Sequence, residues 1–469
     1  MAARKRGRKK TRKQRARESQ SAQDQPTVEQ PVVGMVSLGC AKNTVDSERV
    51  LGMLAERGFA VSADPEWADI VVVNTCAFIA PARKETEKVL RDIARTRPVV
   101  AIGCYPQRMR PRDKTGVYQI SKLRDVAAFV SFEDFDKLPD ICAEILDARF
   151  EGDAPDARFA DAPRLRTGST ASAYLKIAEG CDNRCRYCTI PDIRGPLRSR
   201  PVESLLDEAR SLVELGAREL CVIAQDTAAY GVDLHGESRT PQLLRALCGV
   251  DGLEWVRLLY VHPRHLSDEI VEVLATEPKM CRYLDLPIQH SVDRLLKAMG
   301  RGYNAEALRT LVARLRSDVP GIALRSTVIV GFPGEADEDV ERLVEFMREV
   351  RFDHLGAFEY SKERGTPAAD LPNQVPHNIA VERHKMVMEA QQEIAFEILD
   401  ARVGTTERAL LEYGGPEYDS DFVARTRRES PEVDGRVYVE ANRPAALGDI
   451  VEVEVLQRSE YDLICRIVK

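Results

Sequence analysis

Short, almost continuously apolar runs alternate with longer amphipathic stretches along most of this chain. In the first third, such runs are typical of strands buried on both faces of a parallel sheet. The three runs are VVGMVSL (32–38), DIVVVNT (69–75) and VVAIG (99–103). A helical stretch from about residue 44 to 57 follows the first run, with Asp46 and Ser47 as capping options, and Pro81 opens a second helix. This β-α-β-α-β order predicts an α/β domain with a parallel sheet over residues 31–142.

The alternation resumes after residues 143–166, a stretch rich in Ala, Asp, Arg and Pro that we interpret as a linker. Between residues 167 and 397, helical stretches such as 202–216 and 337–350 separate further apolar runs. These runs are AYLKIAE (173–179), ELCVIAQ (219–225), WVRLLYV (255–261), YLDLPIQ (283–289), ALRSTVIVGF (323–332) and HLGAFEYS (354–361). Repeated β-α units predict an open or partial (β/α) barrel, with its ligand site at the carboxyl ends of the strands.

The pattern changes again from about residue 400 to 469, where the helical runs stop. Short segments with turn signals between them follow: ERALLEY, GGPEYDSD, FVARTRR, GRVYVE, GDIVEVEVL and DLICRIV. They predict a small antiparallel β-barrel of about five strands. Acidic residues outnumber basic ones there, which suits a basic partner better than a polyanion. The fold class is therefore α/β multidomain: a parallel-sheet domain, a partial barrel and a small β-barrel.

Composition indicates the cellular compartment of the protein, and the charge pattern indicates a basic N-terminal tail. No apolar run approaches the roughly 18 residues of a membrane span, and the first residues do not resemble a secretory signal. Eleven cysteines in 469 residues then indicate a reducing compartment, and we expect a cytoplasmic protein. The net charge is −7, yet residues 1–17 contain ten Lys or Arg. We expect residues 1–30 to be a disordered tail that contacts ribosomal RNA or another polyanion, or that serves only as a solubility extension.

Three cysteines, Cys181, Cys185 and Cys188, fall within eight residues in GCDNRCRYC. Thiolates are preferred ligands of iron–sulfur clusters and of zinc, but a structural zinc site needs four protein ligands, and no fourth Cys or His follows closely. A cluster held by three thiolates leaves one iron open for a small chelating molecule. The alternative is three ordinary buried cysteines, which the spacing and the turn-rich flanks disfavour.

Another three cysteines follow the predicted strands of the first domain. Cys40, Cys76 and Cys104 each come directly after one of the three apolar runs. Because the carboxyl ends of parallel strands share one edge of a sheet, these residues are expected to converge there. The sequence therefore predicts a second three-thiolate cluster, although a core cysteine at each strand end stays an alternative.

Seven segments spread over almost the whole chain then resemble the radical S-adenosylmethionine (SAM) methylthiotransferases. They are SLGCAKNTVDSE (37–48), NTCAFI (74–79), GC (103–104), LKIAEGCDNRCRYCTIPDIRGPLRSR (175–200), YVHP (260–263), LPIQHS (286–291) and IVGFPGE (329–335). Within this family, SLGC-x-KN-x-VDSE and LKIAEGC-x-x-x-C are similar to the branch that modifies a ribosomal protein rather than to the tRNA branch. Ala41 and Thr44 depart from the usual Pro and Leu without touching a predicted ligand. The resemblance implies a methylthiotransferase domain, a radical-SAM core and a C-terminal TRAM domain.

The same resemblance implies the reaction. The β-carbon C–H bond of one aspartate in small-subunit ribosomal protein twelve is replaced by C–S–CH₃, using two SAM molecules and two 4Fe-4S clusters. Such a C–H bond has no acidic proton, so radical chemistry is required. The cluster on Cys181, Cys185 and Cys188 would cleave SAM to a radical that takes the hydrogen. The cluster on Cys40, Cys76 and Cys104 would hold the methylated sulfur.

Other candidate residues rest on weaker signals. Gln225 and Asp226 end the second barrel strand, and Gly331, Pro333 and Gly334 follow the fifth, so both loops are expected to face SAM. Tyr187 is interpreted as packing on the adenine of SAM or as shielding the cluster. Arg194 is interpreted as pairing with a carboxylate of SAM or substrate, or as a surface residue. His290 is the one histidine expected near the active edge.

The expected partners follow from the resemblance. They are ribosomal protein twelve, free or on the ribosome, and an electron donor such as flavodoxin or ferredoxin; a monomer is the default. Two other functions stay open: methylthiolation of a modified adenosine in tRNA, and a non-catalytic iron–sulfur or RNA-binding protein. The mass gained by purified target protein or by tRNA discriminates the first two, and absence of deoxyadenosine formation would indicate the third.

Overall fold

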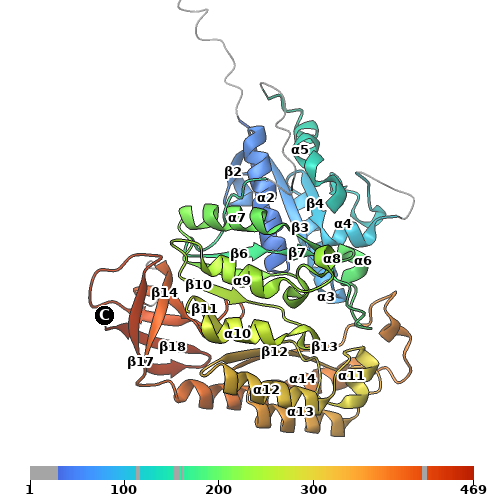
Figure 1. The fold of residues 1–469 in the computed structure, drawn as a ribbon. Coiled ribbons are helices and arrows are strands. Elements are labelled where there is room, and N and C mark those ends of the chain that lie inside the picture. Colours follow the sequence, from blue (N-terminus) through green and yellow to red (C-terminus); the bar gives the residue numbers. More distant parts are fainter. Residues whose placement is uncertain (1–29, 112–116, 151–158, 160–161, 415–419, 469) are drawn as a thin grey trace, which may run out of the picture.

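The computed structural model describes residues 30–111, 117–150, 159, 162–414 and 420–468. The predicted basic tail at residues 1–30 therefore lies, except for Gln30, outside the described residues. Figure 1 shows three parts along the chain: a sheet with helices in blue and cyan, a larger sheet with helices in green to orange, and a small red barrel. The α/β multidomain fold class is confirmed.

The first sheet is fully parallel and has the strand order β2-β1-β3-β4-β5. Its strands are β1 (Val32–Ser37), β2 (Ala60–Ser62), β3 (Ile70–Thr75), β4 (Val99–Gly103) and β5 (Ala128–Val130). The three predicted strands are confirmed as β1, β3 and β4, the neighbours at the centre of the sheet. The sequence analysis missed β2 and β5, because three-residue edge strands carry too few apolar positions to form a pattern.

The helices of this part are α2 (Ala41–Arg57), α3 (Ala80–Ala94), α4 (Cys104–Met109) and α5 (Leu138–Leu146). The predicted start of the first helix near residue 44 was wrong. Cys40 is the N-cap of α2 and offers no side-chain cap, so Asp46 and Ser47 lie inside the helix, where both are buried. Helix α3 begins one residue before Pro81, in agreement with the prediction.

The second sheet is a partial barrel of parallel strands in the order β13-β12-β11-β10-β9-β6. The strands are β6 (Ser172–Lys176), β9 (Glu219–Ile223), β10 (Trp255–Leu258), β11 (Met280–Asp285), β12 (Ala323–Val330) and β13 (His354–Glu359). Each overlaps one of the predicted apolar runs, although β11 begins and ends earlier than the predicted run 283–289. A short antiparallel pair, β7 (Ala178–Glu179) and β8 (Arg198–Ser199), follows β6; β7 is the end of the predicted run 173–179, whereas β8 was not predicted.

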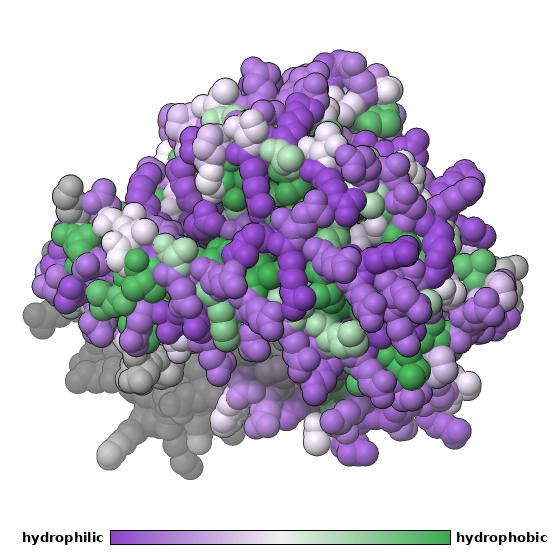
Figure 2. Space-filling view, turned by 90° about the horizontal axis from the view of Figure 1, so that it is seen from below, coloured by the Kyte–Doolittle hydropathy of each residue, from purple (hydrophilic) through white to green (hydrophobic). Residues whose placement is uncertain are grey.

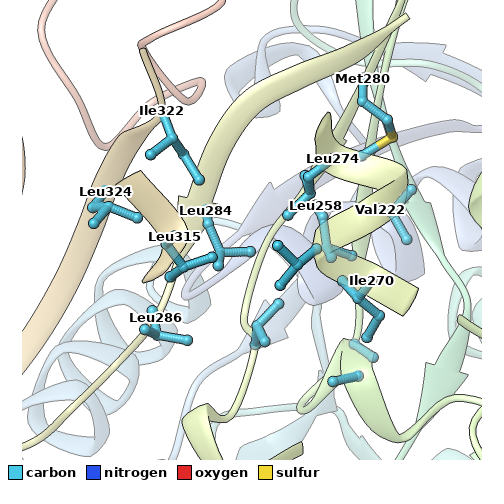
Figure 3. Close-up of a cluster of buried hydrophobic side chains, with 14 of the residues drawn as sticks. Val222, Leu258, Ile270, Leu274, Met280, Leu284, Leu286, Leu315, Ile322 and Leu324 are labelled. Carbon is cyan, nitrogen blue, oxygen red and sulfur yellow. The ribbon is translucent and has the colours of Figure 1, made fainter. Parts of the chain in front are cut away.

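Amphipathic helices cover this sheet. They are α6 (Ile190–Arg194), α7 (Val202–Glu214), α8 (Val232–His235), α9 (Thr240–Cys248), α10 (Asp268–Thr276), α11 (Asp293–Met299), α12 (Ala305–Asp318), α13 (Asp337–Val350) and α14 (His377–Asp400). Leu258 and Leu284 of the sheet lie in one buried cluster with Ile270 and Leu274 of α10 and Leu315 of α12 (Figure 3). Burial of such side chains contributes roughly 1.5–3 kcal/mol each and gives the barrel a rigid outer layer.

The C-terminal part is a closed barrel of strands in the order β14-β15-β16-β18-β17. The strands are β14 (Thr406–Gly414), β15 (Phe422–Thr426), β16 (Val437–Glu440), β17 (Ile450–Ser459) and β18 (Asp462–Ile467). The predicted barrel of about five strands is confirmed, although β16 and β18 pair in parallel. In the segment GGPEYDSD, β14 ends at its first residue, Gly414, and residues 415–419 lie outside the described residues.

Buried ion pairs join the three parts. On one side, Asp46 of α2 pairs with Lys176 at the end of β6, the edge strand of the partial barrel. On the other side, Glu363, which follows the opposite edge strand β13, accepts hydrogen bonds of 2.7 Å from both Arg83 and Arg108. The first α/β part therefore touches both open edges of the partial barrel. The C-terminal barrel is held separately, through Arg425 on Glu219 of β9.

The surface is mainly hydrophilic. Seen from below Figure 1, hydrophobic side chains form small separate groups among hydrophilic ones (Figure 2). Within the described ranges, no helix is both long and apolar enough to cross a membrane.

Candidate functional site

Cys40, Cys76 and Cys104 follow β1, β3 and β4, which are neighbours in the first sheet. The register pairs Ser37 with Asn74 and Thr75 with Gly103, so the three strands end at nearly the same level. Gly39 has a φ of +104°, and a Cβ there would lie 3.0 Å from Cys76 Cβ. Glycine is therefore required for the Cys40 loop to approach Cys76.

Two asparagines hold these loops together. Asn43 Nδ2 donates to Leu38 O over 2.7 Å and to Thr75 O over 3.0 Å. Asn74 Nδ2 donates to Asn43 O over 2.9 Å and to Ser47 Oγ over 3.0 Å. Both asparagines are buried, so the hydrogen bonds of their side-chain amides hold the two strand ends in place. The SLGC-x-KN-x-VDSE segment is thus largely a scaffold for the first cysteine set.

Cys181, Cys185 and Cys188 lie in the loop between β7 and α6. Cys181 N–H donates to Gly195 O over 3.1 Å, and Cys188 N–H donates to Cys185 O over 3.1 Å. The loop is also held from outside, because Arg301 Nη1 donates to Cys185 Sγ over 3.2 Å. The sequence analysis missed Arg301, since it lies 116 positions from Cys185 and only the glycines beside it in MGRGY hint at a close approach.

Each set offers three thiols, the ligand type that iron–sulfur clusters prefer. In the part of the chain that the structure describes, no group of three His, Cys, Asp or Glu is arranged to hold one metal ion. A four-iron cluster binds each thiolate through a different iron, so its ligands stand further apart than those of one ion. Burial raises the pKa of Cys104 to about 11 and that of Cys188 to about 12, and in both cases the other cysteines of the set add to the rise. Metal binding reverses this effect by stabilising the thiolates.

Arg194 joins Cys104 to the segments that flank the second cysteine set. It ends α6, six residues after Cys188, and its Nη2 donates to Cys104 Sγ over 3.4 Å. Its Nη1 donates to Asp46 Oδ2 over 2.9 Å and to Glu179 Oε2 over 2.8 Å. The surface interpretation of Arg194 was wrong, because its side chain is 2% exposed. The carboxylates that pair with Arg194 are those of Asp46 and Glu179 in this chain.

A cavity of about 610 Å³ opens beside the second cysteine set and is lined by Cys181, Cys185 and Asp226. Asp226 Oδ2 accepts 2.7 Å and 2.6 Å hydrogen bonds from Asn183 and His265. Burial would raise the pKa of Asp226, but these hydrogen bonds lower it. Burial, and then the charge of Arg301, lower the pKa of His262 in the cavity wall to about 3, so its ring is neutral at pH 7.

The other sequence-predicted residues are more dispersed. Gln225 Nε2 donates to Glu179 Oε1 over 2.7 Å, next to the cysteine loop, and its Oε1 is buried without a hydrogen-bond partner. The Tyr187 hydroxyl accepts a 3.3 Å hydrogen bond from Arg301. Gly331 and Gly334 do not line the cavity; a Cβ on Gly331 would lie 2.6 Å from Ala380 Cβ of α14.

Comparisons with known proteins agree with this architecture. Residues 32–121 match the uncharacterized protein family UPF0004, residues 175–347 the Radical SAM superfamily, and residues 403–468 the TRAM domain. The ribosomal protein uS12 methylthiotransferase RimO of Trichlorobacter lovleyi is 42% identical over 447 residues, 93% of this chain and 98% of that protein. The RimO of Geobacter sulfurreducens is 43% identical over the same shares. The chain belongs to the RimO family.

A solved structure similar to this RimO-family chain shows the fold alone. It is the radical S-adenosylmethionine methyltransferase TsrM of Kitasatospora setae, determined with cobalamin and a [4Fe-4S] cluster bound. It is 16% identical, with a TM-score of 0.51 over 80% of this chain and 76% of that chain. The predicted family, the radical-SAM methylthiotransferase class, and SAM with 4Fe-4S clusters as cofactors are confirmed.

Proposed function

We propose that this protein methylthiolates the β-carbon of an aspartate in ribosomal protein uS12, forming 3-methylthioaspartate. The observation that carries the proposal is that Arg194, six residues after Cys188, donates both to Cys104 of one thiol set and to Glu179, two residues before Cys181 of the other. One set alone supports SAM cleavage. A second set beside it supports delivery of sulfur to the same substrate carbon. Membership of the RimO family supports uS12 as the acceptor.

The cysteines would hold the clusters: Cys181, Cys185 and Cys188 the one that binds SAM, and Cys40, Cys76 and Cys104 the one that carries the sulfur. When bound, the clusters and SAM supply the electron, the hydrogen-abstracting radical and the methylthio group. Arg301 and Arg194 each donate to one thiol and would balance the negative charge of a thiolate set. Asp226 and Gln225 lie beside the set of Cys181, Cys185 and Cys188 and are proposed to contact SAM. Tyr187, which accepts a hydrogen bond from Arg301 of the cavity wall, is proposed to border that site, as are Gly331 and Gly334.

The remaining partners are also part of the proposal. A uS12 substrate places the enzyme in the cytoplasm, where flavodoxin or ferredoxin could supply electrons and the protein acts as a monomer. The acidic charge balance of the C-terminal barrel suits contact with the basic uS12 itself, whereas the TRAM match and the basic residues 1–17 favour contact with ribosomal RNA near uS12. We propose residues 31–142, 167–397 and 400–469 as the methylthiotransferase, radical-SAM and TRAM domains.

The test combines a substrate assay with iron analysis. Purified uS12 incubated with enzyme, SAM, sulfide and reductant should gain about 46 Da, the mass of one methylthio group replacing hydrogen. Wild-type enzyme should contain about eight irons, and each variant with all cysteines of one set changed to Ala about four. The Cys181, Cys185 and Cys188 variant should lose deoxyadenosine formation, whereas the Cys40, Cys76 and Cys104 variant should lose only methylthiolation. Mass gain by tRNA instead of uS12 would contradict the proposal.

A further inference from the structure

Lys42 lies beside the first cysteine set with an ammonium group that has no charged partner in direct contact. It is two residues after Cys40 in α2 and is 8% exposed. Among the described residues, the interaction found for its ammonium group is a cation–π contact with the Tyr260 ring, whose centre lies 3.1 Å from Nζ. Lysine is almost never buried without an ion pair, because desolvating its charge is costly.

The position of Lys42 in its helix adds to this cost. It is the second residue of α2, whose first turn contains no acidic residue and whose N-cap, Cys40, makes no side-chain cap. The N-terminal turn of a helix carries a partial positive charge and favours anions. A buried cation there is unfavourable by roughly 0.3–1 kcal/mol or more. Local rules broken without compensation are typical of functional positions.

The backbone beneath Lys42 is strained as well. Tyr260, one of the residues after β10, has a φ of +59°, a region that non-glycine residues rarely adopt. The strain is held by three hydrogen bonds: its N–H donates to Asp285 Oδ2 over 3.2 Å, and its carbonyl accepts from Thr227 N–H over 3.1 Å and from Thr227 Oγ1 over 3.4 Å. The result is a tyrosine ring fixed at the carboxyl edge of the partial barrel, facing the first α/β part.

The nearest carboxylates are already engaged by other cations. Asp285 Oδ1 accepts a 3.2 Å hydrogen bond from Arg325 Nη1. Glu179 Oε2 accepts from Lys176 over 2.9 Å and from Arg194 over 2.8 Å. Both carboxylates act on Lys42 only at longer range, Cys40 acts on it more strongly than either, and the charge of Arg194 opposes them. An additional carboxylate at this point would therefore meet an ammonium group that makes no direct ion pair.

We infer that Lys42, whose ammonium group lies over the Tyr260 ring beside the first cysteine set, binds the side-chain carboxylate of the substrate aspartate. This inference rests on the proposed function, whose substrate carries a carboxylate one bond from the reacting β-carbon. The ion pair would hold that carbon beside the sulfur-carrying cysteines and would reject the neutral asparagine. Lys42 is a specificity-determining residue in this scheme.

The experiment is a double-mutant cycle across the complex. Cluster-loaded wild-type enzyme and the Lys42→Met variant are titrated, with SAM but without reductant, with uS12 and with uS12 in which the target Asp is replaced by Asn. Binding is followed by fluorescence anisotropy, so the readout does not depend on turnover. Lys122→Met is the matched control, because Lys122 also faces a tyrosine ring, at 5.8 Å, but is exposed and paired with Glu87.

Close ion pairs couple by more than about tenfold in affinity. We expect Lys42→Met to weaken binding of uS12 at least about tenfold and binding of the Asn form less than about twofold. The Lys122→Met variant should change neither. Equal losses on both substrates, or none, would overturn the inference while leaving the proposed function intact. Failure of the wild type to modify uS12 would overturn both, and circular dichroism and iron content exclude misfolding as the cause of a loss.

Discussion

Arg194 Nη2 lies 3.4 Å from Cys104 Sγ, although Cys104 begins α4 beside the first sheet and Arg194 ends α6, which follows the first strand of the second sheet. A second arginine, Arg301, has the same relation to Cys185 at 3.2 Å. Each cysteine set thus has one buried arginine that donates to one of its thiols. A hydrogen bond from a cation favours the more negative, reduced form of an iron–sulfur cluster. The paired arrangement implies that the two arginines tune the two clusters separately.

Replacing Arg194 by Met should lower the midpoint potential of the cluster on Cys40, Cys76 and Cys104. The loss of one charge-assisted hydrogen bond corresponds to about 50–100 mV for a one-electron couple. The measurement is a potentiometric titration followed by electron paramagnetic resonance, made in a background where the other three cysteines are Ala. Arg194→Lys should recover part of the shift.

Arg301→Met is the matched control for this experiment. It should shift the cluster on Cys181, Cys185 and Cys188 by a similar amount and leave the other cluster unchanged. If both variants shifted both clusters, the arginines would act through general electrostatics or through the fold.

The fold was predictable from sequence where local pattern decides it. The nine longer strands of the two sheets carry continuous apolar runs, and the cysteines at three of their ends could be assigned to one edge because parallel strands end together. The contacts of Arg194, Arg301 and Lys42 could not be predicted, because each joins residues whose proximity depends on how the sheets pack. Asp46 illustrates the limit: it looked like a helix cap in sequence, but it is a buried partner of Lys176 and Arg194.

Glu363 should be essential for holding the first α/β part on the partial barrel. Its carboxylate is 1% exposed and accepts 2.7 Å hydrogen bonds from Arg83, Arg108 and the Ala80 N–H. Glu363→Gln removes the negative charge that pairs with two partly buried arginines. We therefore expect the free energy of unfolding to fall by about 3 kcal/mol. Hydrogen exchange should rise at the start of α3. Unchanged exchange there would mean that the α2 contact to β6 is sufficient.

Gly331 and Gly334 offer a matched test of structural and ligand-binding roles. Both have positive φ, +73° and +82°, but a Cβ on Gly331 would lie 2.6 Å from Ala380 Cβ, whereas a Cβ on Gly334 would come no nearer than 4.0 Å to Arg294 Nη1. Gly331→Ala should cost about 3 kcal/mol in stability from strain plus overpacking. Gly334→Ala should cost about 1 kcal/mol from strain alone. Thermal unfolding measures both, and weaker SAM binding by Gly334→Ala would show that this loop faces SAM.

The contact between the C-terminal barrel and β9 should depend on pH through Glu219. Burial would raise the pKa of Glu219, but Arg257 and Arg425 outweigh burial and lower it to about 2. A carboxyl whose folded pKa is depressed contributes stability above its unfolded pKa of about 4.3, and this contribution is lost as pH falls towards 2. The pair of pKa values corresponds to about 3 kcal/mol at neutral pH.

Glu219→Gln isolates this contribution. The difference in unfolding free energy between wild type and variant should be about 3 kcal/mol at pH 7 and should shrink steadily between pH 5 and pH 3. Urea titrations followed by tryptophan fluorescence suit the measurement, because buried Trp255 lies at this contact, with the Arg427 guanidinium 5.6 Å from its ring. A difference that stays constant over this range would mean that packing, rather than the charge of Glu219, holds the C-terminal barrel on the partial barrel.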